Sequence, residues 1–284
     1  MRWWIYQKER FPLLANGLLV AAFSSCALLY SSYLSEGPLP RWPMFLVAFI
    51  TCLTFFLQLR IADEFKDAHE DAQFRPYRPV PRGLVSLREL GVIFLIGASL
   101  QLILSFTLAP ALVLILLLAW TYLALMSVEF FCRDWLKARP ITYLWTHMLI
   151  MPIVDFFATA AYWVPQSGHA PSGLLWFLTA SFTNGLVIEI GRKIRTPDAE
   201  ETGVPTYSKL WGRPRAILVW RACLIVTAVF AILAAHAIGT ALATAALLGG
   251  FAIVLGQSSK HETMSGIWTL TLYLTLGVLP LFIR

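Results

Sequence analysis

Long apolar runs dominate this sequence, and short polar stretches separate them. A helix rises about 1.5 Å per residue, so about 20 mostly apolar residues cross a hydrocarbon layer about 30 Å thick. Nine segments satisfy this requirement, which predicts an all-α polytopic membrane protein whose nine transmembrane helices form a single bundle and one domain over residues 1–284. The predicted spans are 12–33, 43–61, 87–107, 110–130, 141–164, 172–190, 215–236, 238–256 and 264–282.

Composition and charge agree with a membrane location. Apolar residues make up 58% of the chain and charged residues 13%, whereas about 25% of the residues in soluble domains are charged. If the amino terminus is cytoplasmic, 20 of the 22 lysines and arginines fall in inside segments, and only Arg41 and Arg284 fall outside. Cytoplasmic loops of membrane proteins retain basic residues in this way. The net charge of +6 therefore needs no nucleic-acid partner, and we expect a bacterial inner-membrane protein with a cytoplasmic amino terminus.

The first long inside loop, residues 62–86, carries three carboxylates spaced four residues apart. Asp63, Asp67 and Asp71 would share one face of a continuous helix. Like charges at this spacing destabilise a helix, so the arrangement calls for a cation. Oxygen ligands favour a hard ion, and Mg²⁺ commonly combines one or two carboxylates with substrate phosphates. The sequence thus predicts a Mg²⁺-diphosphate site.

Arginines alternating with prolines follow these carboxylates, and we call residues 75–83 the Arg-Pro arm. Proline ends helices and keeps the chain extended, while guanidinium groups bind phosphate oxygens in pairs. Arg75, Arg78 and Arg82 are therefore candidate diphosphate ligands. The alternative is a solvated charged helix end followed by an ordinary basic cytoplasmic loop, which the regular spacing disfavours.

The string D-x-x-x-D-x-x-x-D followed by R-P-x-R-P-x-P-x-G resembles the first signature of the UbiA superfamily of intramembrane prenyltransferases. That family usually has Asn at the position of Asp63. The resemblance extends to length and the nine-span plan. It implies Mg²⁺ and a prenyl diphosphate held by two aspartate-rich motifs, with Asp67 and Asp71 as the closest counterparts of family residues. It also suggests a diphosphate contact from Lys137.

The second long inside loop, residues 191–214, departs from that family's second signature. Glu189 stands near the expected first aspartate, and Lys193 occupies the position four residues on. Two alternatives follow. Either later carboxylates, Asp198 among them, fold back to hold a second metal ion together with Glu189, or basic side chains bind the diphosphate in place of one ion. The further carboxylates are Glu200 and Glu201, and the basic candidates are Arg192, Lys193 and Arg195.

Three polar residues occur within predicted spans. Because such groups are costly in a bilayer and usually face a cavity or a partner, Glu129, Asp155 and Asn184 are expected to line a substrate chamber. Glu129 lies close enough to the membrane surface that its side chain could instead extend to the interface.

The resemblance implies a membrane prenyltransferase, with Asp63, Asp67, Asp71 and Glu189 as catalytic and metal-binding residues. The expected reaction is Mg²⁺-dependent transfer of a prenyl group from an isoprenoid diphosphate to an aromatic or alcohol acceptor. A terpene cyclase of the same fold, which needs no acceptor, is the main alternative. The D-G-x-x-A-R signature of CDP-alcohol phosphotransferases is absent from the sequence, and clustering of the ionisable groups at one surface disfavours a transporter.

Overall fold

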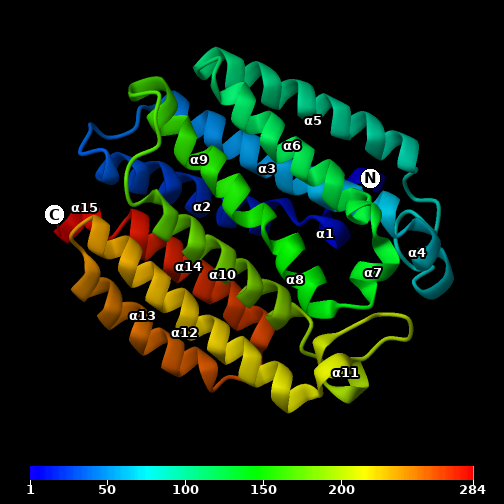
Figure 1. The fold of residues 1–284 in the computed structure, drawn as a ribbon. Coiled ribbons are helices and arrows are strands. Elements are labelled where there is room, and N and C mark those ends of the chain that lie inside the picture. Colours follow the sequence, from blue (N-terminus) through cyan, green and yellow to red (C-terminus); the bar gives the residue numbers. More distant parts are fainter. Residues whose placement is uncertain (284) are drawn as a thin grey trace.

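A computed structural model describes residues 1–283, and all regular secondary structure in that range is helical (Figure 1). Two short 3₁₀ turns, Glu129–Phe131 and Pro197–Ala199, interrupt the α-helices. The α-helices are α1 (Arg2–Arg10), α2 (Leu13–Leu34), α3 (Trp42–Lys66), α4 (Ala68–Phe74), α5 (Leu87–Leu108), α6 (Leu112–Ser127), α7 (Arg133–Lys137), α8 (Pro140–Met148), α9 (Ile150–Gln166), α10 (Leu174–Arg192), α11 (Tyr207–Trp211), α12 (Arg213–Ala237), α13 (Ala241–Gly256), α14 (His261–Gly277) and α15 (Pro280–Ile283).

The prediction of an all-helical membrane protein is confirmed. In the part of the chain described, 7 segments are long and apolar enough to cross a membrane. The two other predicted spans correspond to α6 and α13, which are apolar but have 16 residues each. Sixteen residues rise about 24 Å, less than the usual hydrocarbon thickness. The total of nine crossings therefore stays a prediction.

Local sequence explains where several helices begin and break. Ser86 starts α5 with a capping box, in which its hydroxyl accepts from the Glu89 N–H and the Glu89 carboxylate accepts from the Ser86 N–H. The predicted span 141–164 consists of α8 and α9, separated at Leu149. Pro152 has no N–H to donate to the carbonyl of Met148, which favours an interruption there.

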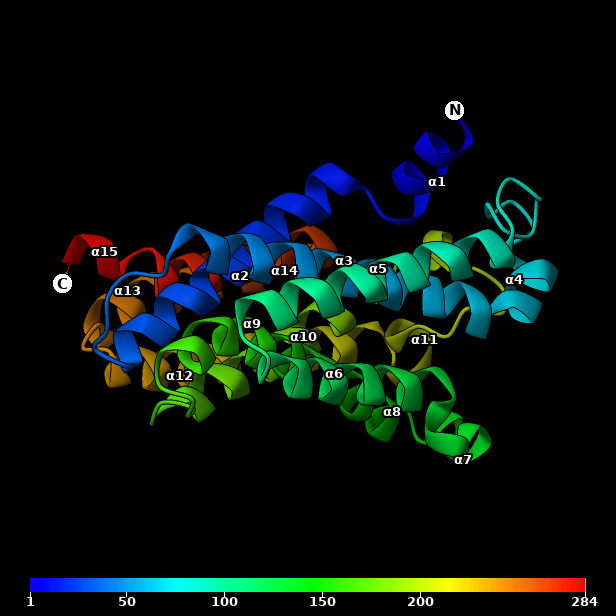
Figure 2. The ribbon, with the colours of Figure 1, turned by 90° about the horizontal axis from the view of Figure 1, so that it is seen from above.

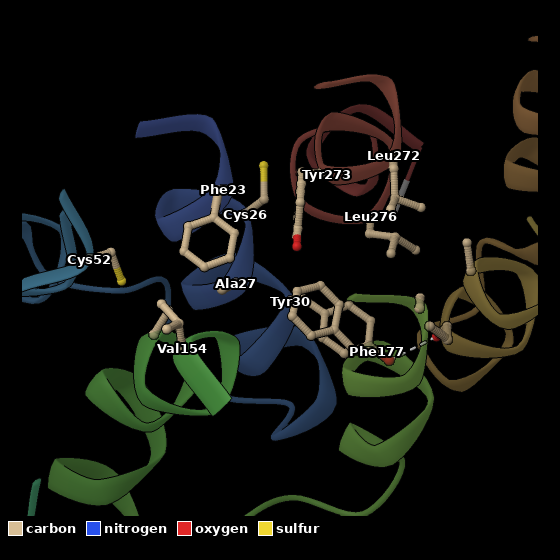
Figure 3. Packing of buried hydrophobic residues seen from close by; sticks show 14 of the residues in the cluster. Phe23, Cys26, Ala27, Tyr30, Cys52, Val154, Phe177, Leu272, Tyr273 and Leu276 are labelled. Carbon is tan, nitrogen blue, oxygen red and sulfur yellow. Dashed lines mark hydrogen bonds between the residues drawn. The ribbon is translucent and has the colours of Figure 1, made fainter. Parts of the chain in front are cut away.

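Helix α2 lies at the centre of the largest buried cluster and contacts α3, α9 and α14. Figure 3 shows Tyr30 of α2 stacked on Phe177 of α10, and Phe23 of α2 beside Tyr273 of α14. A Cβ atom at Gly277 would lie 2.4 Å from the backbone of Cys26, so glycine is required for this approach of α14 to α2. Packing around α2 thus brings the two halves of the chain together.

The polar connections collect at one end of the bundle. Helices α4, α7 and α11 lie together there, whereas the carboxyl terminus lies at the opposite end (Figure 1). Helix α1 lies at the edge of the bundle on the side of α4 (Figure 2), where Tyr6 packs against Ile61 and Leu90 of α3 and α5. The two long loops predicted to carry the chemistry are therefore neighbours in space.

Candidate active site

A cavity of about 1550 Å³ opens between the two long loops and extends into the bundle. Within the described range its wall contains ten basic and seven acidic side chains, mainly at the end near α4 and α11. Deeper in the bundle, the wall is formed mainly by apolar and aromatic side chains of α2, α3, α9, α10 and α14. Phe23, Phe56, Ile150, Met151 and Tyr273 are among these deeper residues. The cavity therefore joins a charged mouth to an apolar interior.

The three aspartates of the first loop do not share a continuous helical face. Helix α3 ends at Lys66 and α4 begins at Ala68, with the break at Asp67. Asp63 and Asp67 line the cavity. Asp71 is buried and is not part of the cavity wall. The expectation that all three carboxylates point the same way was wrong, because the helix is interrupted between them.

Asp71 instead anchors the Arg-Pro arm. Its two carboxylate oxygens lie 2.6 Å from Arg75 and 2.7 Å from Arg78. Both arginines also line the cavity. Arg82, further along the arm, pairs with Glu9 at 3.0 Å and lies outside the cavity wall. The structure thus presents two of the three predicted arginines to the mouth.

Asp67 is a partly buried carboxylate at the break between α3 and α4. Its carboxylate makes no hydrogen bond or ion pair among residues 1–283. Burial raises its pKa, and the negative charges of Asp63, Asp71 and Glu70 raise it further, against an opposing effect of Lys66. A divalent cation would relieve this repulsion. Asp63 is only loosely paired, with Arg60 at 3.5 Å and Lys66 at 3.8 Å.

Glu70 is a cavity residue that sequence reasoning missed. Its carboxylate accepts from Lys137 at 2.6 Å and from Arg133 at 3.0 Å. The hydrogen bond from Lys137 is the main reason that the pKa of Glu70 is lowered. These contacts hold α7 against α4, and they place the predicted ligand Lys137 on the cavity wall.

Glu189 lies near the end of α10 and lines the mouth. It is buried and pairs with Arg192 at 2.5 Å and with Lys193 at 2.9 Å. All three side chains line the cavity. Asp198, predicted as a metal ligand, is exposed in a 3₁₀ turn and is not part of the cavity wall. Glu189 and Asp198 are therefore not brought together at the cavity.

Glu129 is the centre of a buried polar network that sequence reasoning found only in part. Its carboxylate lies 3.3 Å from Lys66 Nζ and 3.2 Å from His147 Nε2, and it accepts from Tyr143 Oη at 3.1 Å. Burial alone would raise the pKa of Glu129, but His147 and Lys66 lower it to about 2. Glu129, Phe130 and Phe131 all have positive φ. Left-handed backbone costs non-glycine residues about 1–2 kcal/mol each, so surrounding contacts must hold this turn.

Asp155 and Asn184 lie directly behind the cavity wall. Tyr273 lines the cavity and donates a 2.7 Å hydrogen bond to Asp155. Thr269 also lines it and donates to the Asn184 side-chain oxygen at 3.1 Å. Both predicted polar residues are fully buried. Neither residue lines the cavity as expected. Each is hydrogen-bonded to a residue that does, Asp155 to Tyr273 and Asn184 to Thr269.

The carboxylates at the mouth could bind Mg²⁺ only together with oxygen atoms of a bound phosphate-containing ligand. Among the residues described, no group of three or more His, Cys, Asp and Glu side chains could hold a metal ion. Mg²⁺ accepts one or two carboxylates when phosphate oxygens and water complete its shell. Asp63 and Asp67 on the cavity wall match that mode.

Other missed cavity residues come from distant parts of the chain. Arg10 enters from the end of α1, and Tyr143 and His147 from α8. The i, i+4 spacing of Tyr143 and His147 was the available signal, since it places both on one helical face. Nothing local in the sequence pairs Arg10 with Glu64 on α3.

These features define a polytopic membrane protein whose cavity joins a charged mouth to an apolar interior. A model of the UbiA prenyltransferase family matches residues 14–282, and the chain belongs to this family. The chain is also similar to the apo structure of a UbiA homolog from Aeropyrum pernix K1. The TM-score is 0.71 at 14% sequence identity, covering 93% of this chain and 97% of that chain. No curated protein matches this sequence.

Proposed function

We propose that this protein catalyses Mg²⁺-dependent transfer of a prenyl group from an isoprenoid diphosphate to an aromatic or alcohol acceptor inside the membrane. The observation that carries the proposal is the division of one cavity of about 1550 Å³ into a charged mouth and an apolar interior. A prenyl diphosphate is divided in the same way, into a charged diphosphate group and an apolar hydrocarbon chain. Membership of the UbiA family supports prenyl transfer as the general activity.

In this proposal Asp63 and Asp67 hold Mg²⁺ at the mouth. The ion neutralises charge on the diphosphate leaving group. Arg75, Arg78 and Lys137 bind the diphosphate oxygens, since all three line the same mouth. Asp71 keeps the Arg-Pro arm in place through its two short ion pairs.

The apolar interior has the complementary task. It takes up the prenyl chain and excludes water, so that the allylic carbon, when positively charged, meets the acceptor before it meets water. The Glu129 network holds Lys66 beside Asp63 at the border between the two regions. That border is where the bond to the diphosphate would break.

A terpene cyclase remains the second candidate, and aromatic rings in the interior favour it. Phe23 packs edge-to-face on Phe56 and on Tyr273, with ring centroids 5.8 and 5.2 Å apart. All three rings line the cavity. Aromatic faces stabilise cations by cation–π attraction, so this wall suits a carbocation that reacts with its own chain.

The proposed topology has nine crossings, a cytoplasmic amino terminus and the active site on the cytoplasmic side of a bacterial inner membrane. The positive-inside distribution of the basic residues supports it. Protease protection of a tag at the amino terminus, compared in spheroplasts and inverted vesicles, tests the orientation. Cleavage in spheroplasts would contradict it.

The activity test uses purified protein in nanodiscs with prenyl diphosphates of increasing length and Mg²⁺. Pyrophosphate release is measured with and without aromatic acceptors. Dependence on an acceptor supports the transferase, whereas hydrocarbon products without one support the cyclase. The variant Asp67→Asn should lose turnover, and the matched control Glu9→Gln, at an exposed ion pair with Arg82, should keep it. Undiminished turnover by Asp67→Asn would refute the metal assignment.

A further inference from the structure

Two carboxylates of the second long loop, Glu200 and Glu201, are paired with other groups of the protein. Glu200 accepts from Thr206 at 2.7 Å. Glu201 accepts from Tyr77 and from Arg195, each at 2.8 Å. These two residues therefore tie the loop to itself and to the Arg-Pro arm. Glu201 also lines the cavity, but neither carboxylate could join Glu189 in binding a metal ion without breaking these contacts.

Glu189 itself is held by cations of its own helix end. Lys193 stands one helical turn after Glu189, where a second carboxylate would be needed to form a pair of metal ligands. Arg192 takes the other carboxylate oxygen. A divalent ion placed there would meet two positive side chains within contact distance of its single carboxylate ligand. The residues on this side of the mouth therefore do not fit a metal ion.

They do fit an anion. Arg192 binds Glu189 through Nε alone, and its two terminal amino groups make no hydrogen bond in the described part of the chain. Its side chain is 46% exposed and lines the cavity. Lys193 contacts Glu189 with one of its three N–H donors and also lines the cavity. Glu189 thus orients two cations that keep hydrogen-bond donors open to a ligand, although Lys193 Nζ also lies 5.7 Å from the centre of the Tyr207 ring.

We propose that Arg192 and Lys193 replace the second metal ion, so that the diphosphate is held by one divalent ion on the Asp63 side and by these two cations on the Glu189 side. This inference rests on the proposed function, because it assumes a diphosphate in the cavity. It chooses between the two alternatives that the sequence left open for the second loop. It also assigns Glu189 as a positioning residue for the two cations.

Cationic side chains differ from a metal ion in that a chelator does not remove them. They should therefore still bind the diphosphate after divalent ions have been removed. Charge-assisted hydrogen bonds contribute about 1.5–3 kcal/mol each, which is about tenfold or more in affinity. Part of the diphosphate affinity should therefore persist in EDTA and depend on Arg192 and Lys193. Binding of divalent ions should be non-cooperative.

The test measures ion stoichiometry rather than turnover. The full chain in nanodiscs is titrated with Mn²⁺ in the presence of farnesyl thiodiphosphate, which resists cleavage, and bound Mn²⁺ is counted by electron paramagnetic resonance. Affinity for the same analogue is measured calorimetrically in EDTA for the parent protein and for Arg192→Ala, Lys193→Ala and Lys193→Arg. Lys209→Ala is the matched control, since Lys209 is a loop cation outside the cavity wall.

We expect one Mn²⁺ per bound analogue. In EDTA we expect a loss of about tenfold in Lys193→Ala and in Arg192→Ala, recovery in Lys193→Arg, and a change under twofold in the control. Two bound Mn²⁺ ions, or unchanged affinity in both alanine variants, would overturn the replacement while leaving the prenyltransferase proposal intact. Failure of the analogue to bind with or without Mn²⁺ would refute the proposed function, and the inference with it.

Discussion

Replacing Glu129 by glutamine tests the electrostatic network at the border of the cavity. The side chain keeps its size but loses the charge that pairs with Lys66 at 3.3 Å and His147 at 3.2 Å. Glu129 is buried, and the side chain of its charged partner Lys66 is only 14% exposed. Removing one partner of a buried pair leaves the other charge unpaired, which commonly costs about 3–5 kcal/mol.

The lowered pKa of Glu129 gives a second value for the free energy by which this carboxylate stabilises the fold. It is lowered from 4.5 to about 2, and one pKa unit corresponds to about 1.4 kcal/mol, so the ionised carboxylate stabilises the fold by about 3 kcal/mol. Because the folded-state pKa lies below the unfolded value, this stabilisation is complete above about pH 4.5 and disappears as the pH falls toward 2. The effect of Glu129→Gln should therefore be largest near neutral pH.

Thermal unfolding in detergent, followed by tryptophan fluorescence, measures this effect. We expect Glu129→Gln to lower Tm by about 6 °C at pH 7, since about 1 kcal/mol shifts Tm by about 2 °C in a chain of this size. The difference from the parent should shrink at pH 4. The control is Glu9→Gln, whose exposed pair with Arg82 contributes at most about 1 kcal/mol. If both variants unfold within about 1 °C of the parent at pH 7, our account of the network is wrong.

Three further variants probe packing and the site. Gly191→Ala should destabilise the protein by about 1–3 kcal/mol in denaturant titrations, because its Cβ would lie 2.1 Å from Ser265 Oγ. Tyr273→Phe should cost about 1–3 kcal/mol of thermal stability, since Asp155 would lose its 2.7 Å donor; an unchanged Tm would argue against that bond. Asp71→Asn should weaken diphosphate binding about tenfold or more by calorimetry, because a charged hydrogen bond from Arg78, of about 1.5–3 kcal/mol, and an ion pair with Arg75 hold the Arg-Pro arm. Parent-like affinity would contradict the anchoring role.

Local sequence was sufficient for most of the fold. Apolar length located the helices, because burying backbone in lipid requires continuous helical hydrogen bonding over a fixed thickness. The Arg-Pro arm and the nearby carboxylates were also recognisable from residue type and spacing. The break at Leu149 was not predicted, although Pro152 was a visible cause.

The sequence did not reveal which carboxylate forms ion pairs within the protein and which faces the cavity. Periodicity places Asp63, Asp67 and Asp71 on one face only if the helix continues, and it does not continue past Lys66. Asp71 pairs with arginines that follow it, whereas Asp67 retains no partner in the described structure. Spacing cannot distinguish these outcomes, because ion pairing depends on how the chain folds back after the helix.

The sequence by itself thus determined the membrane class, the helical segments and the two loops that carry charge. These properties follow from hydropathy and residue type, which act locally. Only the tertiary structure decided which charges face the cavity. It brought Glu129 to Lys66 and His147 from separate helices, and it brought Glu70 of α4 to Lys137 of α7. Electrostatic interactions act through space over a few ångströms, so they depend on packing that no local pattern specifies.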